Sequence, residues 1–275
     1  MDRWLVNGAQ KASISLEDRG LSYGDGLFET IAVRDGKCRF LDAHLQRLQA
    51  GCSRLGLAEQ PTDTLIAELV AAIAHSKHGT AKIIITRGCG PRGYRPPTNP
   101  EPTRIIGYQE STAGAPVLSG VQIRYCTTLI SRNRQTAGIK SLNRLEQVLG
   151  QSEWNDPGIA EGLMLNDKGE VVCGTMTNLF CSRDNVLLTP NLSECGIKGV
   201  MRQQVIEVAR AADITVKECA IDKRDLMHAD DLFLTNSLLG LITVAELDGR
   251  RYSPSALTTE IKLGLCALGV EECAA

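Results

Sequence analysis

The sequence predicts a mixed α/β protein of two domains. Its 275 residues exceed the roughly 100–200 residues of one typical domain. Short apolar runs typical of strands alternate with amphipathic segments typical of helices. Residues 111–120 (STAGAPVLSG) gather small residues, Gly and Pro, which is typical of a linker. We therefore expect a smaller α+β domain over 1–110, an interdomain linker over 111–120 and a larger mixed α/β domain over 121–275.

The smaller domain is expected to contain a β-hairpin, because the turn Asp35-Gly36 separates two apolar runs. Asp42 is a favourable N-cap for the helix that follows the hairpin. In chain order, the predicted elements are strands at 27–34 and 38–41, helices at about 42–55 and 62–77, and strands at 81–86 and 103–108.

The larger domain is expected to mix strands and helices throughout. Its predicted strands lie at 121–126, 161–166, 170–174, 178–181, 185–189, 214–220, 231–235 and 241–247. Its predicted helices lie at 142–153, about 199–212, 223–228 and 255–268.

Composition excludes several classes of protein. Lys plus Arg is 30 and Asp plus Glu is 32, whereas a nucleic-acid binder would need a basic stripe. The chain lacks a secretory signal pattern and an apolar run of roughly 20 residues, so we expect a cytoplasmic protein without a membrane anchor. The ten cysteines are scattered without a CxxC pair, and we expect no metal site.

The segment GCGPRG at 88–93 matches the GxGxxG pattern of nicotinamide-cofactor binders and follows a predicted strand. That fingerprint must open a helix, and the prolines of the following YRPPTNPEP prevent one. We instead expect a loop in which Arg87, Arg92 and Arg95 either bind carboxylates or form a solvated basic surface.

Lys140 has a distinctive context, TAGIKSLNRLEQVL. It precedes a helix predicted to begin near Ser141, and the positive end of a helix dipole favours a neutral amine. A desolvated lysine there would be a good nucleophile and base. Spacing alone leaves open the alternative of a surface lysine at a helix start.

The segment GIKSLNRLEQV resembles the active-site segment of aminodeoxychorismate lyases, which are fold-type IV pyridoxal-phosphate enzymes. Further segments match the family in the same order: DRGLSYGDGLFET, LDAHLQRL, ITRGCGPRGY, NLF and GIKGVMRQ. Together they span most of the chain. The resemblance implies the two-domain fold of the D-amino-acid aminotransferase type and a homodimer.

The resemblance also implies roles for individual residues. Lys140 would bind pyridoxal 5'-phosphate as a Schiff base and then act as acid and base. Arg47 would anchor the cofactor phosphate. Backbone N–H groups of Gly199, Val200 and Met201 would assist it, since helix N-termini bind anions. Asn236 and Ser237 would form a second phosphate-contacting turn.

One position departs from the family pattern. The family places a glutamate, the partner of the pyridine nitrogen, five residues before the Asn that corresponds to Asn178, and this chain has Cys173 there. Three interpretations are open: the change impairs the enzyme, the thiol acts as a thiolate, or aromatisation of the product lets the reaction tolerate a weaker electron sink. Glu170 is expected to point elsewhere.

The implied reaction converts 4-amino-4-deoxychorismate to 4-aminobenzoate and pyruvate, a step of folate biosynthesis. Phe28, where D-amino-acid aminotransferases carry a tyrosine, and Arg92 are the expected substrate-binding residues. Two alternatives remain. One is a D-amino-acid or branched-chain aminotransferase on the same fold, and the other is a pyridoxal-phosphate-binding protein impaired by Cys173.

Overall fold

The computed structural model describes residues 3–10, 13–111 and 118–274. The chain divides into two compact units, residues 1–114 with 139–143 and residues 115–138 with 144–275. Most of the expected linker, residues 112–117, lies outside the described residues. That 1–110 and 121–275 are separate domains stays a prediction. Within the described ranges, no helix has the length and apolar character needed to cross a membrane.

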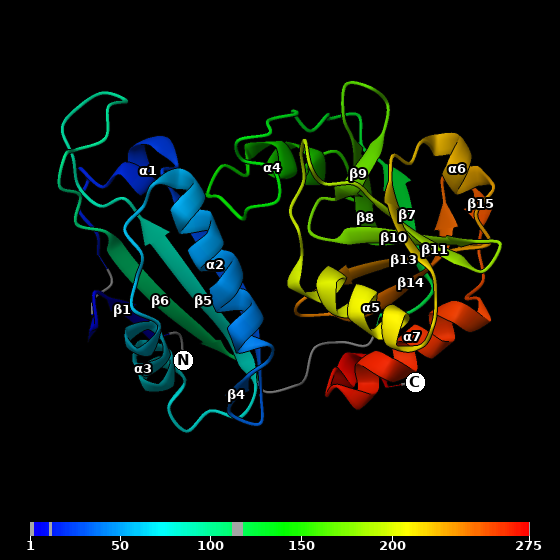
Figure 1. Cartoon of the computed structure of the whole chain (residues 1–275), viewed down its shortest axis with the longest axis horizontal. Coiled ribbons are helices and arrows are strands. Elements are labelled where there is room, and N and C mark those ends of the chain that lie inside the picture. Colours follow the sequence, from blue (N-terminus) through cyan, green and yellow to red (C-terminus); the bar gives the residue numbers. More distant parts are fainter. Residues whose placement is uncertain (1–2, 11–12, 112–117, 275) are drawn as a thin grey trace. The chain divides into compact units, whose positions relative to one another are not determined.

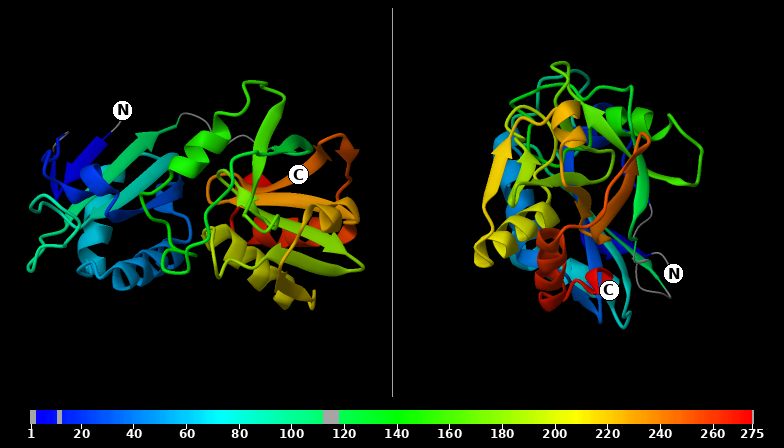
Figure 2. Two further views of the ribbon diagram at one scale, coloured as in Figure 1. Left: turned by 90° about the horizontal axis from the view of Figure 1, so that it is seen from above. Right: turned by 90° about the vertical axis from the view of Figure 1, so that its right-hand side faces the viewer.

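The first unit is an antiparallel sheet covered by helices α2 and α3 on one face (Figures 1 and 2). Its strand order is β2-β1-β6-β5-β3-β4. The strands are β1 (Arg3–Val6), β2 (Ala9–Gln10), β3 (Gly26–Arg34), β4 (Lys37–Cys38), β5 (Gly79–Thr86) and β6 (Thr103–Glu110). The helices are α1 (Arg19–Tyr23), α2 (Leu41–Leu55) and α3 (Thr62–Ile73).

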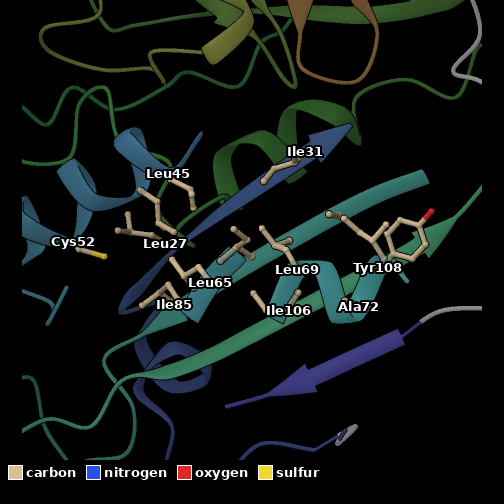
Figure 3. Packing of buried hydrophobic residues seen from close by; sticks show 14 of the residues in the cluster. Leu27, Ile31, Leu45, Cys52, Leu65, Leu69, Ala72, Ile85, Ile106 and Tyr108 are labelled. Atoms are coloured by element: carbon tan, nitrogen blue, oxygen red, sulfur yellow. The ribbon is translucent and has the colours of Figure 1, made fainter. Parts of the chain in front are cut away.

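The core of this unit lies between the sheet and its two helices. Figure 3 shows Leu45 and Leu65 from α2 and α3 facing Leu27, Ile31 and Ile106 from the strands. Burial of this apolar surface is the main force that holds the helices on the sheet. The helices predicted at about 42–55 and 62–77 are therefore confirmed, although the second ends at Ile73.

The predicted hairpin is confirmed, since Val33 pairs with Cys38 and Arg34 with Lys37 across the Asp35-Gly36 turn. The prediction of Asp42 as N-cap is wrong. Helix α2 already begins at Leu41, and Asp42 lies in its first turn, where a carboxylate favours the helix dipole.

The structure adds a hairpin of β1 and β2 that the sequence pattern did not predict. Leu5 pairs with Gln10 and Val6 with Ala9. The intervening Asn7-Gly8 pair is the typical two-residue turn of a hairpin. Strands this short lack a clear alternation of apolar residues, so the Asn7-Gly8 turn is the feature of the sequence that could have predicted this hairpin.

The second unit is a mixed sheet in the order β12-β11-β10-β13-β14-β7-β8-β9, with β15 beside β14. The sheet curls, so that β9 also contacts β10. Helices α5 and α7 pack side by side on the sheet (Figures 1 and 2). The strands are β7 (Val121–Tyr125), β8 (Ile159–Leu165), β9 (Val171–Gly174), β10 (Asn178–Arg183), β11 (Val186–Pro190), β12 (Val216–Cys219), β13 (Asp231–Asn236), β14 (Gly240–Leu247) and β15 (Arg250–Arg251). The helices are α4 (Leu145–Gln151), α5 (Val200–Ala211), α6 (Lys223–Met227), α7 (Ala256–Ala267) and the 3₁₀ turn η1 (Glu271–Cys273).

The helix predicted over 142–153 is shorter than expected. It begins at Leu145, and its N-cap is Arg144 rather than Ser141. The preceding residues instead pair with the start of β3: the N–H of Leu142 donates to the carbonyl of Gly26 at 3.0 Å. Pairing with a strand therefore replaces the first turn of the predicted helix.

Candidate active site

Lys140 is held against strand β3 of the first unit. The Phe28 N–H donates to the Lys140 carbonyl at 2.9 Å, and Ser141 forms a bridge with Leu27. The Lys140 Nζ lies 4.3 Å from the centroid of the Phe28 ring. Two predicted site residues, far apart in the sequence, are thus brought together, with the ammonium over an aromatic face.

The start of β3 is packed closely enough to require a glycine. A Cβ atom at Gly26 would collide with the Ile85 carbonyl oxygen and come within 2.9 Å of the Leu142 side chain. A larger residue would therefore clash with the backbone of the neighbouring strand β5 and would also displace the Leu142 side chain. The glycine in the DGLFET motif therefore has a packing reason.

Arg47 lies on α2 and forms a two-pronged ion pair with Glu29 of β3. Its Nε donates to Glu29 Oε1 at 2.8 Å, and its Nη2 donates to Glu29 Oε2 at 2.5 Å. His44, one turn earlier on α2, places Nδ1 at 2.7 Å from Glu29 Oε2. The predicted phosphate anchor is therefore fixed in place by two residues to which the sequence pattern gave no role.

The charge states within this cluster follow from its hydrogen bonds. Burial opposes ionisation of Glu29, but hydrogen bonds from His44 and Arg47 outweigh it and hold the pKa of Glu29 below its ordinary value. Burial lowers the pKa of His44, so its ring is neutral at neutral pH. An ionised carboxylate can only accept, so His44 Nδ1 carries the proton and donates it to Glu29.

In the second unit, the predicted anion-binding groups lie around the start of α5. Gly199 is the N-cap, and no side chain of the described residues caps this helix end. The Asn178 amide donates to the Ile197 carbonyl at 2.9 Å, and its Oδ1 would collide with a Cβ atom on Gly199. Only glycine therefore lets the N–H groups of Val200 and Met201 begin the helix here.

The turn after β13 lies close to this helix end. Thr235, the residue before Asn236, pairs with Asn178 on the neighbouring strand β10. The Asn236 side-chain oxygen accepts from the N–H groups of Leu238 at 3.0 Å and Leu239 at 2.8 Å. This side chain therefore shapes the turn that contains Ser237.

Cys173 lies on β9 opposite Met164 and is buried among Cys126 and Cys195. Burial raises the pKa of its thiol to about 12, and the nearby Glu161 carboxylate acts in the same direction. The thiol is therefore protonated at neutral pH in this structure, and the thiolate interpretation requires the positive charge of the ring nitrogen to lower its pKa.

Two acidic residues near Cys173 have other partners. Glu170 accepts from the Asn166 amide at 2.7 Å. Glu161 accepts from the N–H groups of Thr175 at 3.0 Å and Met176 at 3.1 Å, and from the Thr177 hydroxyl at 3.0 Å. Glu161 thus fixes the turn that follows Cys173, a role that the sequence pattern IAEGLML did not reveal.

The loop after β5 holds Arg92 beside a cavity of about 540 Å³, which is also lined by Tyr23 and Cys89. Arg19 supports this loop through the carbonyls of Gly93 and Tyr94.

The prediction of a solvated arginine is wrong for Arg87, and the carboxylate that it binds belongs to the protein itself. Arg87 is buried and bound to Asp25, with Nε 2.8 Å from the carboxylate. It also donates to the carbonyls of Leu55 and Gly56, so it braces the first unit and is neither a solvated arginine nor one that faces substrate.

The fold and this set of residues define the class of protein: the chain belongs to the family described as amino-transferase class IV, whose model matches residues 26–247. Members of this family are pyridoxal-phosphate-dependent enzymes, so the cofactor and fold predictions are confirmed.

Individual relatives agree with the resemblance in the sequence. A curated aminodeoxychorismate lyase from Vibrio harveyi is 33% identical over 244 residues, which cover 87% of this chain and 89% of that protein. The crystal structure of 4-amino-4-deoxychorismate lyase from Pseudomonas aeruginosa matches with a TM-score of 0.88 and 41% identity, covering 97% of this chain and 98% of that chain. A putative branched-chain-amino-acid aminotransferase from Methanocaldococcus jannaschii is 32% identical over 246 residues, covering 87% of this chain and 84% of that protein.

The sequence contains a pattern from which the buried position of Glu29 could have been predicted. In LFETIAV, the alternation of β3 puts Leu27, Glu29 and Ile31 on one face. A charged residue at an inward position of a strand indicates either a paired ion or a site.

Proposed function

We propose that this chain removes pyruvate from 4-amino-4-deoxychorismate and leaves 4-aminobenzoate. The observation that carries the proposal is the position of Lys140, whose Nζ lies 4.3 Å from the Phe28 ring centroid on a strand that also fixes Arg47. The similarity to lyases from two organisms selects this reaction within the family.

The residues present fit pyridoxal 5'-phosphate. Its aldehyde suits the amine of Lys140, and its phosphate suits the Arg47 guanidinium and backbone N–H groups at a helix start. Gly199 through Met201 and the turn of Asn236 and Ser237 are the proposed backbone donors. When bound, the cofactor supplies an electron sink conjugated to the amino group of the substrate.

Lys140 is the proposed acid and base. Its amine takes the proton from the ring carbon that bears the amino group, the bond between the adjacent ring carbon and the ether oxygen breaks, and the ring becomes aromatic. The same Nζ then delivers a proton to the methylene carbon of the departing enolpyruvate, which leaves as pyruvate. Phe28 packs beside Nζ and limits its access to water, and Arg92 is the proposed partner of a substrate carboxylate.

Cys173 is proposed to be the neutral neighbour of the cofactor's ring nitrogen. A neutral thiol stabilises a positive ring nitrogen less than a carboxylate does. Aromatisation of the product favours the lyase reaction strongly, whereas transamination has no comparable driving force. This chain is therefore proposed to tolerate Cys173 as a lyase more readily than it would as an aminotransferase.

An aminotransferase is the second candidate, supported by the similarity to the Methanocaldococcus jannaschii protein. It would convert the bound cofactor to its amino form when given an amino acid alone. A lyase would instead release 4-aminobenzoate and pyruvate in equal amounts from aminodeoxychorismate.

The proposal is tested by the visible absorption of the purified protein before and after borohydride, followed by peptide mapping and a product assay. We expect a pyridoxyl group on Lys140 and equimolar release of both products. Lys140→Ala should lose the adduct and the activity, whereas Lys82→Ala, which removes another lysine near Phe28, should keep the adduct. An adduct on a different lysine, or none, would contradict the proposed role of Lys140.

A homodimer in the cytoplasm completes the proposal. Helix α4 exposes Leu145, Val148 and Leu149, an apolar patch of the kind that subunit contacts cover. The ten cysteines are free thiols, as is usual for a protein of a reducing compartment.

A further inference from the structure

Glu29 is an unusual residue for its place in the fold. It is only 1% exposed, and its neighbours on the inward face of β3, Leu27 and Ile31, are 2% and 0% exposed. A buried ion pair is costly to desolvate, and apolar residues of similar size often stabilise a protein as well or better. Stability alone therefore does not account for a carboxylate at this position.

The hydrogen bonds of Glu29 fix one side chain in particular. Its two oxygens accept the Nε and Nη2 donors of Arg47, the paired geometry that sets the plane of a guanidinium. The other edge of the guanidinium, with Nη1, is then turned away from Glu29 in a defined direction. A long arginine side chain that would otherwise sample many rotamers is held in one.

His44 completes the arrangement without adding charge. Its neutral ring donates from Nδ1 to Glu29 Oε2 at 2.7 Å. This bond fixes the carboxylate that in turn fixes Arg47. His44 and Arg47 are three residues apart, on one face of α2.

We propose that Glu29 and His44 are positioning residues, which orient the Arg47 guanidinium so that its outer edge binds the cofactor phosphate in one geometry. This inference rests on the proposed function, because it takes Arg47 as the phosphate anchor. Glu29 offsets part of the positive charge of Arg47, so its contribution is orientation rather than attraction. Preorganised donors bind a ligand more tightly because less freedom is lost on binding.

Strand β3 links this anchor to the proposed catalytic lysine. Glu29 directly follows Phe28, whose N–H binds the Lys140 carbonyl and whose ring faces Nζ. The charge of Lys140 also acts on His44, so the two groups share one neighbourhood. Adjacent residues of one strand thus hold the two points to which the cofactor would be attached.

The test compares the affinities of pyridoxal 5'-phosphate and pyridoxal, which lacks the phosphate, for the cofactor-free protein. The readout is the dissociation constant of pyridoxal divided by that of pyridoxal 5'-phosphate, both obtained by absorbance titration. General damage to the fold weakens the binding of both ligands equally and leaves this ratio unchanged. A misoriented phosphate anchor lowers the ratio selectively.

The variants form two matched pairs. Glu29→Gln removes the charge that holds Arg47, and Glu68→Gln is its control. Glu68 also forms a buried ion pair in the first unit, with Arg104 Nη2 at 2.8 Å, but this pair is not part of the cluster around Arg47. His44→Leu removes the donor to Glu29, whereas His44→Asn retains an N–H near the position of Nδ1.

We expect Glu29→Gln and His44→Leu to lower the ratio by about tenfold, as the loss of a supporting contact does at other ligand sites. Glu68→Gln and His44→Asn should keep the wild-type ratio. A wild-type ratio in Glu29→Gln or His44→Leu would overturn the positioning role. If Glu29→Gln does not fold, the two His44 variants decide the question.

The outcome for the wild-type protein separates this inference from the proposed function. A protein that binds both ligands equally has no phosphate anchor, which would overturn the proposed role of Arg47 and the positioning role with it. If the wild-type protein prefers the phosphorylated ligand and the Glu29 and His44 variants keep this preference, the proposed function stands and only the positioning role is overturned.

Discussion

Cys173 stands where the family resemblance in the sequence places a glutamate. Its thiol is buried, and its pKa is raised to about 12, so the neighbour that it is proposed to offer the cofactor is neutral. We expect Cys173→Glu to change the rate of 4-aminobenzoate formation by less than about tenfold, or about 1.4 kcal/mol in barrier height. The reason is that aromatisation of the product, rather than the ring nitrogen, drives the proposed reaction.

The measurement is turnover of aminodeoxychorismate by the reconstituted variant, with Cys173→Gln, which has the size of glutamate without its charge, as the steric control. A rise of several orders of magnitude in Cys173→Glu would show that the natural residue impairs the enzyme. The buried carboxylate of Glu161 lies close by, so the variant must also be tested for folding.

At the level of elements, the start of α5 depends on the close packing of Gly199 against the Asn178 side chain. We expect Gly199→Ala to weaken binding of pyridoxal 5'-phosphate by roughly 1.5–3 kcal/mol, the value of a hydrogen bond to a charged group. The new Cβ would collide with Asn178 Oδ1 and displace that side chain, and it would shift the first N–H groups of the helix.

A cofactor titration checks this expectation. Gly158→Ala is the control, because a Cβ there meets only the Asp156 carboxylate, at 3.2 Å and beyond. Equal affinities in Gly199→Ala and wild type would exclude the start of α5 as a phosphate site.

For the whole molecule, the exposed side of α4 bears on the oligomeric state. Val148 and Leu149 are 57% and 52% exposed, and charged residues are depleted from the centres of subunit interfaces. We expect Val148→Asp to convert a dimer to a monomer, as measured by light scattering during size-exclusion chromatography. Leu263→Asp, at an exposed position of α7, should remain dimeric; a wild-type monomer would refute the proposed dimer.

The alternation and spacing of apolar residues determined the main elements and the mixed α/β class. Local signals predicted the hairpin at Asp35-Gly36 and the helix α2, because these depend on neighbours in the chain. The family resemblance supplied Lys140, Arg47 and the cofactor, and the comparisons confirmed the family and the cofactor. The roles of the individual site residues stay predictions.

Tertiary structure decided where local preferences competed with distant partners. The segment around Ser141 has the pattern of a helix start, yet it pairs with the start of β3. Arg87 looks like a loop arginine, yet Asp25 and two carbonyls bury it. Glu29 and His44 acquire their shared role only because α2 folds onto β3. Such pairings join residues far apart in the chain, so their energies are absent from any local pattern.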